Sequence, residues 1–541
     1  MIHTEFKPEE IYASHNFEHQ PQMHNQYQLN MLNHQSHRLN KHQPNMQNNH
    51  RYLPDWEEFS QLAQPGLIVP VWRELVLDTE TPVTAFKKIA RSGKGFLLES
   101  VEGGHKSSQY SFLGSQPFMI FSARGRQIRI ERADGQVNEY AGSVLDELRQ
   151  VLAAYRSAVP AHCPRFCGGA VGYFGYEMVQ QLMEGPAFRN RSPYPDVYLM
   201  FFDSVYIFDH SRRTMLFLTN VRVQGNPQEA YIAAGQKIDR MIAEFRQSVA
   251  EKSVVETVAQ SKGVDPSANF TPQAFMQAVT RAKAHIAAGE VLQVVLSQKF
   301  RLPCKVAPLD LYRSLRSVNP SPYLFYLDGP GFQIVGSSPE VHVRLENGQV
   351  LLRPIAGTRP RGRDAQEDVQ LEKELRNDPK EQAEHLMLVD LARQDLERVC
   401  EPESITVPVL GQIERYSHVM HLVSEVRGRL RSGEDGLSLL GATFPAGTVS
   451  GAPRKRAMEL IAEIEPEARG VYAGAAGYLS FQGNLDTGII IRTMVVEPEQ
   501  ITFQAGAGIV ADSVPEREYQ ETRNKAQAIL KAIQQLEESK E

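Results

Sequence analysis

Two segments of the chain begin helices that each carry a pair of acidic residues. In Asp378-Pro379-Lys380-Glu381, an Asp suited to the N-cap precedes a proline at the first helical position. The segment Ser513-Val514-Pro515-Glu516 repeats this order near the end of the chain. Residues three apart share one face of a helix, so each helix should present two carboxylates together. The pairs are Glu381 with Glu384 and Glu518 with Glu521, and Lys525 shares the face of Glu521.

Two acidic helix faces that meet across a cleft would hold a hard divalent cation through oxygen ligands. Magnesium would keep open coordination positions for a substrate carboxylate. The spacing also fits a simpler structural interpretation. Glu381 stands where it could close a capping box, and Glu521 with Lys525 could form an ordinary surface ion pair worth about 0.3–0.5 kcal/mol. Spacing alone leaves both interpretations open.

The elements that must position these helices follow an alternation of strands and helices. Thr271 and Pro272 mark the start of a helix that runs towards Ala288. Four strands are expected next, and Asn347-Gly348 predicts a hairpin between two runs of apolar residues. The pattern predicts an α+β fold with antiparallel sheet. The expected strands are Gln293 to Phe300, Tyr323 to Leu327, Gln333 to Val335 and Val341 to Leu345.

Composition divides the rest of the chain. Residues 1–50 are rich in His, Asn and Gln and offer little apolar surface, so we expect a disordered extension. A folded region should follow over 51–247, with order beginning near Leu53 to Trp56. Residues 248–268 read as a polar surface connection, and 269–535 as the main domain. Within 51–247 we expect buried strands at Phe96-Leu97-Leu98 and Val205 to Phe208, and a helix from Val144 to Ala158.

Charge and cysteine usage exclude several classes of function. The 541 residues carry a formal net charge of −6 with both signs balanced, which argues against nucleic acid or an anionic membrane as a partner. The four cysteines show no paired C-x-x-C spacing, and no signal-like apolar segment opens the chain. The longest apolar run, Val197 to Phe208, is far short of the roughly 20 residues that span a bilayer. We therefore expect a cytoplasmic protein.

Several motifs between Thr271 and Leu530 together resemble the chorismate-utilising enzymes. No single motif is specific, but their order and intervals identify the chain as similar to this family. The resemblance implies a large sandwich of two subdomains, built from mainly antiparallel sheets flanked by helices. The motifs are Leu292 to Gln298, Gly336-Ser337-Ser338-Pro339-Glu340, Pro354 to Gly362, Glu384 to Leu391, Arg415 to Ser424, Thr448 to Arg454 and Gln504 to Gly508.

The resemblance implies a magnesium enzyme, with Glu384 and Glu521 as metal ligands and Glu381 and Glu518 behind them. Two further positions bear on the product. Relatives that make isochorismate or salicylate carry a lysine where this chain has Gln293, and that amine activates water. Relatives that make aminodeoxychorismate commonly carry a lysine where this chain has Ala356. With both amines absent, ammonia itself is expected to attack carbon 2 of the chorismate ring.

The anthranilate-forming members are the most similar branch, and the resemblance implies a role for each site residue. Glu340 matches the acid near the leaving hydroxyl, and His421 the residue associated with loss of pyruvate. Arg492 and Tyr472 match the ligands of the enolpyruvyl carboxylate. Glycine lets a backbone approach a ligand closely, so the Gly506 segment is expected to donate N–H groups to a carboxylate. The remaining substrate-binding residues implied are Gly357, Thr358 with a hydroxyl that donates to the substrate, Thr448, Ala507, Gly508 and Lys525.

A second site is expected where two distant segments match the family's tryptophan-binding regulatory site. Without the resemblance, Leu97-Leu98 is a core strand and Pro320-Ser321-Pro322 a turn. With it, Ser and Glu would anchor an amino acid, while Pro and aromatic side chains would hold an indole. Feedback inhibition by L-tryptophan follows. The implied residues are Leu98, Glu99, Ser100, Pro320, Ser321, Pro322, Tyr323 and Leu324.

No cysteine lies in a context that resembles a glutamine amidotransferase nucleophile. The ammonia is therefore expected from a separate glutamine amidotransferase subunit, in a heterotetramer, with free ammonia as a poorer substitute. Two alternatives stay open: the first subunit of an aminodeoxychorismate synthase in folate synthesis, and a catalytically silent regulator that binds tryptophan. Ala356 and the segment Leu97 to Ser100 favour anthranilate over the first, and the complete set of site residues argues against the second.

Overall fold

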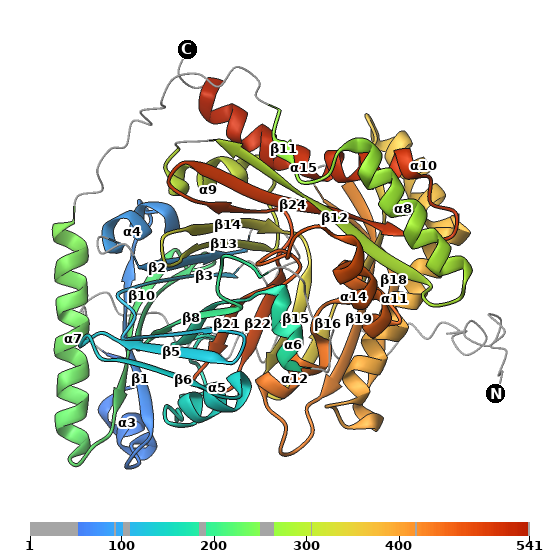
Figure 1. The fold of residues 1–541 in the computed structure, drawn as a ribbon. Helices are drawn as coiled ribbons and strands as arrows, with labels where there is room; N and C mark the ends of the chain where they lie inside the picture. Colours follow the sequence, from blue (N-terminus) through green and yellow to red (C-terminus); the bar gives the residue numbers. More distant parts are fainter. Residues whose placement is uncertain are drawn as a thin grey trace, which may run out of the picture. The chain divides into compact units, whose positions relative to one another are not determined.

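The computed structural model describes residues 52–90, 94–100, 109–182, 191–248, 265–303, 306–416 and 419–538. The extension expected over 1–50 lies outside these residues. Residues 52–538 belong to one compact unit. It contains two large antiparallel sheets that face each other, with helices on the outside (Figure 1).

The first sheet has twelve strands among the described residues, and its order joins both halves of the chain. Neighbouring strands pair antiparallel throughout, as the Asn347-Gly348 hairpin and the short connections predict. In order the strands are β1 (Ile68–Val76), β10 (Thr214–Arg222), β9 (Ser204–Asp209), β3 (Tyr110–Ser115), β2 (Gly95–Glu99), β13 (Tyr323–Asp328), β14 (Gln333–Ser338), β23 (Thr493–Val496), β24 (Gln500–Ile509), β12 (Gln293–Pro303) and β11 (Ser267–Ala268), with β20 (Gly451–Ala452) beside β12.

The second sheet also has twelve strands within the described part of the chain. Asn347 and Gly348 both have positive φ, +51° and +78°, as the two central residues of the predicted hairpin require. In order the strands are β17 (Ile355–Pro360), β19 (Val419–Arg429), β16 (Gln349–Leu352), β15 (Val341–Glu346), β22 (Leu485–Ile489), β21 (Ala475–Ser480), β7 (Gly169–Phe174), β8 (Val197–Phe202), β4 (Met119–Arg124), β5 (Gln127–Arg132) and β6 (Val137–Ala141), with β18 (Thr406–Arg415) beside β19.

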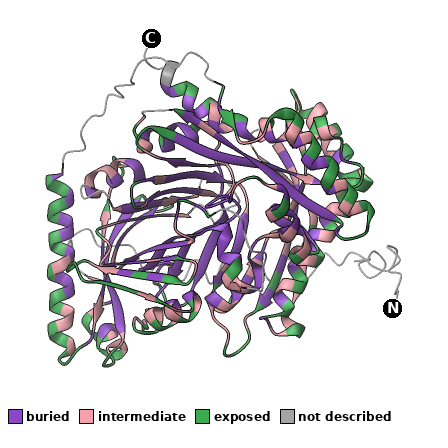
Figure 2. Cartoon of the chain, viewed as in Figure 1, coloured by how far each residue is buried: buried purple, intermediate pink, exposed green. Residues whose placement is uncertain are grey.

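Alternation of side chains along the strands builds separate cores on the two faces of each sheet. Phe96 on β2 and Met200 on β8 point into one aromatic-rich core between the sheets. Their neighbours Leu97 and Leu199 point outward into two further cores, which the helices cover. The strands are accordingly the most buried elements, and the outer helix faces the most exposed (Figure 2).

The outer helices cover the sheets in two groups. The helices α4 (Pro82–Ile89), α7 (Pro227–Gln247), α9 (Pro308–Val318) and α15 (Pro515–Glu538) pack on the first sheet. The helices α11 (Pro379–Glu397) and α12 (Gly436–Thr443) pack on the second sheet, whereas α8 (Pro272–Ala287) and α14 (Arg454–Ile464) pack on strand β12 of the first. The remaining helices are α3 (Trp56–Leu62), α5 (Val144–Ala153), α6 (Val179–Leu182), α10 (Ala365–Asn377) and α13 (Gly447–Ser450), with 3₁₀ turns at Tyr176–Met178 and Pro402–Ser404.

The regions expected over 51–247 and 269–535 are interleaved. Strand β2 pairs with β13 in the first sheet, and β7 pairs with β21 in the second. The connection expected over 248–268 ends in strand β11, while residues 249–264 lie outside the described residues. The helix expected from Val144 to Ala158 is shorter than predicted, because it ends at Ala153 and Ser157 then bridges to Ile68 of β1.

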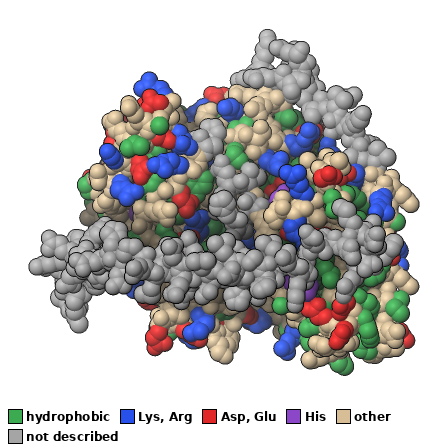
Figure 3. Space-filling view, turned by 180° about the vertical axis from the view of Figure 1, so that it is seen from behind, with side chains coloured by type: hydrophobic (Ala, Val, Ile, Leu, Met, Phe, Trp, Pro, Cys, Tyr) green, Lys and Arg blue, Asp and Glu red, His purple; other side chains and the backbone are tan. Residues whose placement is uncertain are grey.

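The described surface agrees with the balanced charge of the chain. On the face seen in Figure 3, basic and acidic side chains are interspersed where the described residues are visible. Among the described helices, none is long and apolar enough to span a membrane.

Candidate active site

The two acidic helices begin close to the predicted positions. The Asp378 carboxylate accepts hydrogen bonds from the N–H groups of Lys380 and Glu381, at 3.0 and 3.4 Å, so it caps α11 as expected. Helix α15 begins at Pro515, but the Ser513 hydroxyl accepts from the Val510 N–H group in the preceding turn. Glu384 and Glu521 therefore lie in the first two turns of their helices.

The carboxylates of the two helices converge. Burial raises the pKa of Glu384, and the Glu381 carboxylate raises it further. Burial also raises the pKa of Glu518, and the Glu521 carboxylate adds to that rise. Lys525, which pairs with Glu521 at 2.6 Å, stabilises the charged forms of both Glu384 and Glu518. The ends of α11 and α15 thus lie within electrostatic reach of each other.

This donor set fits a hard cation. Within the described residues, no group of three or more His, Cys, Asp or Glu side chains is placed to hold a metal ion, and Glu384 and Glu521 come from two different helices. The repulsion among these partly buried carboxylates is an energetic cost that a divalent cation would offset. Glu381 does not close a capping box, because its carboxylate accepts from Arg359 at 3.1 Å.

Gln293 lies beside the first of these carboxylates. Its amide Nε2 donates to Glu384 Oε1 at 3.0 Å, and the residue is only 5% exposed. A Cβ atom on Gly508 would lie 2.7 Å from this amide nitrogen, so glycine is needed at 508 for Gln293 to reach Glu384. A neutral amide thus fixes the orientation of Glu384 and cannot take a proton from water.

Glu340 follows β14 and faces Thr448 of α13. Burial raises the pKa of Glu340 to about 7, although Thr448, Lys525 and Arg492 each favour its charged form. Glu340 and Thr448 also line a cavity of about 430 Å³, and of the described residues predicted for the site only these two line it. A carboxyl group that is about half protonated near neutral pH can act as a general acid.

His421 is held by the strand pair β17 and β19. A bulge between Ala356 and Thr358 brings the Gly357 carbonyl oxygen within 2.9 Å of His421 Nδ1, with Thr358 Oγ1 at 3.1 Å. A carbonyl oxygen can only accept, so Nδ1 is assigned the proton and Nε2 the lone pair. Burial lowers the pKa of His421, which keeps the ring neutral and Nε2 free to act as a base.

Ala356 precedes this bulge. It is 8% exposed and pairs with Leu422 of β19. The next residue, Gly357, has φ of +64°, and a Cβ atom there would lie 2.8 Å from Leu375. Close packing therefore leaves little room for larger side chains in this part of β17.

Arg492 and Tyr472 approach the glycine segment of β24. Arg492 has φ of +52°, a sparsely populated conformation for a residue with a side chain, and its carbonyl oxygen accepts from the Ser337 N–H group at 3.2 Å. The Tyr472 hydroxyl would lie 2.7 Å from a Cβ atom on Gly506. Lys525 Nζ donates to the Gly506 carbonyl oxygen at 2.9 Å, which joins α15 to the same segment.

Electrostatic interactions show that these groups from distant segments form one cluster. Arg492 acts on Glu340 and on His421 and is itself influenced by Glu521, while Lys525 acts on Glu340, Glu384 and Glu518. Ala507 is the exception, because it is fully buried in the core on the other face of β24. Arg492 and Lys525 thus link acidic and basic groups from β19, α11 and α15 by electrostatic interactions.

The second predicted site is a separate cavity of about 440 Å³. Antiparallel pairing of β2 with β13 places Glu99 opposite Leu324 and so brings the two distant segments together. Leu98, Glu99, Ser100, Pro322, Tyr323 and Leu324 line the cavity. Among the described residues Pro320 and Ser321 do not, and Ser321 is buried below it, 2% exposed.

The polar anchors of this cavity differ in part from the expectation. The Glu99 carboxylate accepts from the Tyr312 hydroxyl at 2.5 Å and pairs with Arg316 at 3.2 Å, both on α9, so it is already engaged. The Ser100 hydroxyl is buried without a hydrogen-bond partner among the described residues.

Sequence reasoning missed several lining residues of the cavity. Arg165, Arg344 and Asp486 form a buried charged wall, in which Arg344 pairs with Asp486 at 3.0 Å. No local motif marks them, because pairing of β15 with β22 places Arg344 opposite Asp486, far apart in the sequence.

The fold and the convergent site define a chorismate-binding enzyme. The family model described as chorismate binding enzyme matches residues 96–531. Several relatives at 40–46% identity are named anthranilate synthase component 1. The chain therefore belongs to the chorismate-binding enzymes and, within them, to the anthranilate synthase component 1 family.

The relatives align along nearly their whole length. The protein of Acetivibrio thermocellus is 43% identical over 491 residues, which cover 90% of this chain and 99% of the relative. The protein of Aquifex aeolicus is 46% identical over 492 residues, covering 90% and 98%. Both are named anthranilate synthase component 1.

Solved structures give the same fold. Anthranilate synthase component I from Streptococcus pneumoniae superposes with a TM-score of 0.69 at 35% identity, covering 84% of this chain and 98% of the other. The menaquinone-specific isochorismate synthase of Escherichia coli superposes with a TM-score of 0.66 at 21% identity, covering 88% and 97%, which supports the fold alone.

Proposed function

We propose that the protein converts chorismate and ammonia to anthranilate, pyruvate and water in tryptophan biosynthesis, with a magnesium ion bound at Glu384 and Glu521. The observation that carries the proposal is the convergence of three groups. Arg492 acts electrostatically on both a half-protonated Glu340 and a neutral His421. Lys525 acts on both Glu340 and Glu384, to which the uncharged Gln293 donates. This set can protonate a leaving hydroxyl and remove a ring proton, but Gln293 cannot activate water.

Binding would neutralise both carboxylates of chorismate. Arg492 can hold the enolpyruvyl carboxylate in a bidentate fork, with the Tyr472 hydroxyl as a second donor. Glu384 and Glu521 would hold magnesium, which neutralises the ring carboxylate when it is bound. Lys525 stands between Glu521 and the Gly506 carbonyl oxygen and limits the negative charge of the acidic cluster.

Two proton transfers would then be carried by the protein. Ammonia attacks carbon 2 while the Glu340 carboxyl gives its proton to the hydroxyl at carbon 4, which leaves as water, and the ammonium group formed on carbon 2 then loses a proton, which restores Glu340. In the second stage a base removes the proton from carbon 2, and the enolpyruvyl group leaves as the enolate of pyruvate, which takes up a proton at its methylene carbon. His421 Nε2 is suited to that step, because its ring is neutral and its Nδ1 proton is held by Gly357.

Tryptophan would inhibit by binding in the second cavity. Its lining by Pro322, Tyr323 and Phe325 suits an indole ring. The unpartnered Ser100 hydroxyl offers a hydrogen bond to the polar end of the ligand. Strand β21, which contributes Tyr478 to the cavity, begins three residues after Tyr472, so a short continuous segment of the chain joins the two sites.

Ammonia would come from a glutamine amidotransferase partner. The name component 1, which the relatives carry, implies a second component. Of the three cysteines in the described residues, Cys167 and Cys400 are buried, and burial raises the pKa of the Cys400 thiol to about 11. That environment does not activate a nucleophile.

Product analysis tests the proposal. The purified chain is incubated with chorismate, magnesium and ammonium at mildly alkaline pH, and the products are separated by chromatography with fluorescence detection. Anthranilate with an equal amount of pyruvate is expected, and chelation of magnesium should abolish both. Aminodeoxychorismate without pyruvate would contradict amination at carbon 2, and absence of turnover would favour a silent regulator.

A further inference from the structure

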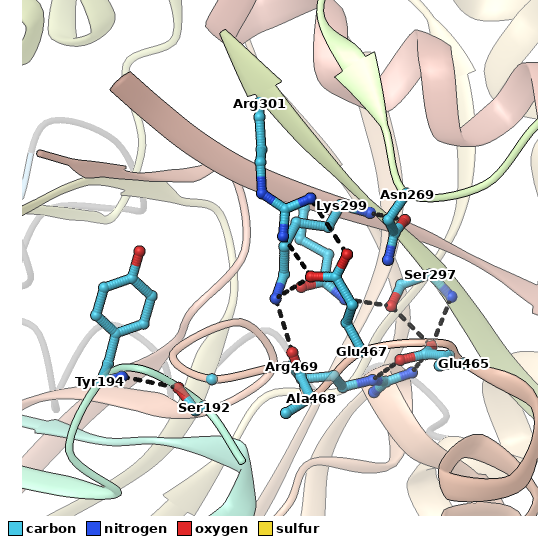
Figure 4. A network of polar contacts seen from close by, with 12 residues as sticks. Ser192, Tyr194, Asn269, Ser297, Lys299, Arg301, Glu465, Glu467, Ala468 and Arg469 are labelled. Atoms are coloured by element: carbon cyan, nitrogen blue, oxygen red, sulfur yellow. Dashed lines mark hydrogen bonds and ion pairs between the residues drawn. The ribbon is translucent and has the colours of Figure 1, made fainter. Parts of the chain in front are cut away.

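A buried ion pair joins Arg469 to Glu465 within a network of polar contacts (Figure 4). It follows α14 in a segment without regular secondary structure. The side chains are only 1% and 4% exposed. A fully buried pair is a poor source of stability when compared with apolar residues of similar volume, so its hydrogen bonds indicate what it positions.

The Arg469 guanidinium joins three parts of the chain. It forms a two-pronged pair with Glu465, through Nε to Oε2 at 2.9 Å and through its terminal nitrogen to Oε1 at 2.7 Å. Its terminal nitrogens also donate to the carbonyl oxygens of Val449 and Val295, each at 2.7 Å. Four bonds from one planar group fix the spacing of these parts.

The two backbone partners of Arg469 are each next to a residue of the candidate site. Val449 follows Thr448, which faces Glu340, and Val295 lies two residues beyond Gln293 on β12. The guanidinium also lies over the ring of Tyr472, 5.5 Å from its centre, and over the ring of Tyr176, at 4.7 Å. Arg469 therefore contacts the site residue Tyr472 directly and the neighbours of Thr448 and Gln293 through Val449 and Val295.

Glu465 extends the same connection to β24. Its Oε1 accepts from both the backbone N–H group and the hydroxyl of Ser297, each at 2.8 Å. The Ser297 hydroxyl accepts from Gln504 at 2.7 Å, and Ser297 pairs with Gly506 across the two strands. The ion pair thus also sets the position of the glycine segment.

The segment that carries Arg469 is held by residues outside the candidate site. Lys299 Nζ donates to the Ala468 carbonyl oxygen at 2.7 Å and pairs with Glu467 at 3.6 Å, and Arg301 pairs with Glu467 as well (Figure 4). The Glu177 carboxylate accepts from the Gly470 N–H group at 2.9 Å. These bonds keep Arg469 in place without touching the candidate site.

We propose that Arg469, held by Glu465, is a positioning residue that aligns Thr448, Tyr472 and strand β12 around the substrate. The proposal rests on the function proposed above and adds a residue that carries no role in it. The guanidinium touches none of the reacting groups. It acts through the Tyr472 ring and through the site residues next to its backbone partners, Val449 and Val295.

The first test compares Arg469→Lys with Arg301→Lys. Lysine keeps the charge opposite Glu465 but lacks the planar fork, so it loses the bonds to Val449 and Val295 together. We expect kcat/KM for chorismate to fall at least tenfold, with a higher KM and a lower kcat. Arg301→Lys makes the same substitution in the same network and should keep the wild-type values, because in the described part of the chain the Arg301 side chain donates its hydrogen bonds to the Glu467 carboxylate.

A pH profile distinguishes positioning from loss of stability. Thr448 favours the charged form of Glu340, so a displaced Thr448 raises the pKa of Glu340. In Arg469→Lys the fall of kcat on the alkaline side should therefore move to higher pH. Thermal unfolding of both lysine variants measures stability separately, and an activity loss that follows stability without this pH shift would overturn the proposal.

Ser297→Ala keeps the test decisive where Arg469→Lys does not fold. It leaves the ion pair intact and removes one hydrogen bond from Glu465 and one from Gln504. We expect kcat/KM to fall about three- to tenfold with little change in the unfolding temperature. Wild-type kinetics in Ser297→Ala, together with Arg469→Lys behaving like Arg301→Lys or not folding, would overturn the inference. Failure of the wild-type chain to form anthranilate would instead contradict the proposed function.

Discussion

Glu340 shows how burial at a single residue prepares a carboxyl group for acid catalysis. Its pKa near 7 results from desolvation that outweighs the nearby Thr448, Lys525 and Arg492. The folded-state pKa is raised, so the carboxylate form is disfavoured and any contribution of Glu340 to stability is lost as pH rises through about 7.

Replacement of the Glu340 carboxyl group by an amide should remove the general acid while the size of the side chain stays the same. For Glu340→Gln we expect kcat to fall about 10²–10⁴-fold, the usual range for loss of a general acid. At a fixed concentration of free ammonia, the wild-type kcat should decrease as pH rises above about 7, and the variant should lose this dependence. Unchanged circular dichroism serves as the control, and a variant with near-normal kcat would contradict the role of Glu340.

Substitutions of Ala356 test whether this position of β17 faces the substrate. For Ala356→Lys we expect anthranilate formation to be crippled, because a buried, unpaired ammonium group costs several kcal/mol and crowds the pocket. Ala356→Met, of similar length but uncharged, separates crowding from charge when steady-state kinetics are compared. Near-normal turnover of the lysine variant would mean that this position does not face the substrate.

At the scale of elements, the bulge in β17 holds His421 in its tautomer. Gly357 has positive φ and little space, since a Cβ atom would lie 2.8 Å from Leu375 and 3.2 Å from Glu381. Gly348 in the hairpin between β15 and β16 has positive φ as well, but no atom within 4 Å of such a Cβ. The two glycines therefore differ in packing and share the backbone conformation.

This difference allows a matched comparison. Gly348→Ala should cost about 1 kcal/mol of unfolding free energy from backbone conformation alone. Gly357→Ala should cost about 2–4 kcal/mol, because overpacking adds to the strain, and it alone should lower kcat by displacing the carbonyl oxygen from His421. Denaturant unfolding and steady-state kinetics check both, and equal effects of the two substitutions would contradict the account of the bulge.

At the scale of the whole molecule, two segments more than 200 residues apart meet in the second cavity. Ser100→Phe should fill the cavity and abolish inhibition by tryptophan while kcat without tryptophan stays near the wild-type value. Ser321→Ala is the control, because Ser321 lies in the predicted motif but does not line the cavity. A Ser100→Phe variant as sensitive as the wild type would contradict the location of the regulatory site.

Local patterns in the sequence were sufficient for the elements that depend on near neighbours. Asp378 and Thr271 cap the predicted helices, and Asn347-Gly348 forms the predicted hairpin. The fold class and family followed from motifs in order. These features are readable because capping, turn conformation and periodicity involve residues a few positions apart.

Contacts between distant segments could not be read in the same way. Pairing of β2 with β13 brings Ser100 beside Tyr323, and α9 engages the Glu99 carboxylate that was expected to bind a ligand. Gln293 meets Glu384, and Arg469 is buried behind Tyr472, although no motif marks either relation. The chain's own residue types established which chemistry is available. The order of strands in two sheets established which groups share a pocket, because that order depends on packing of the entire core.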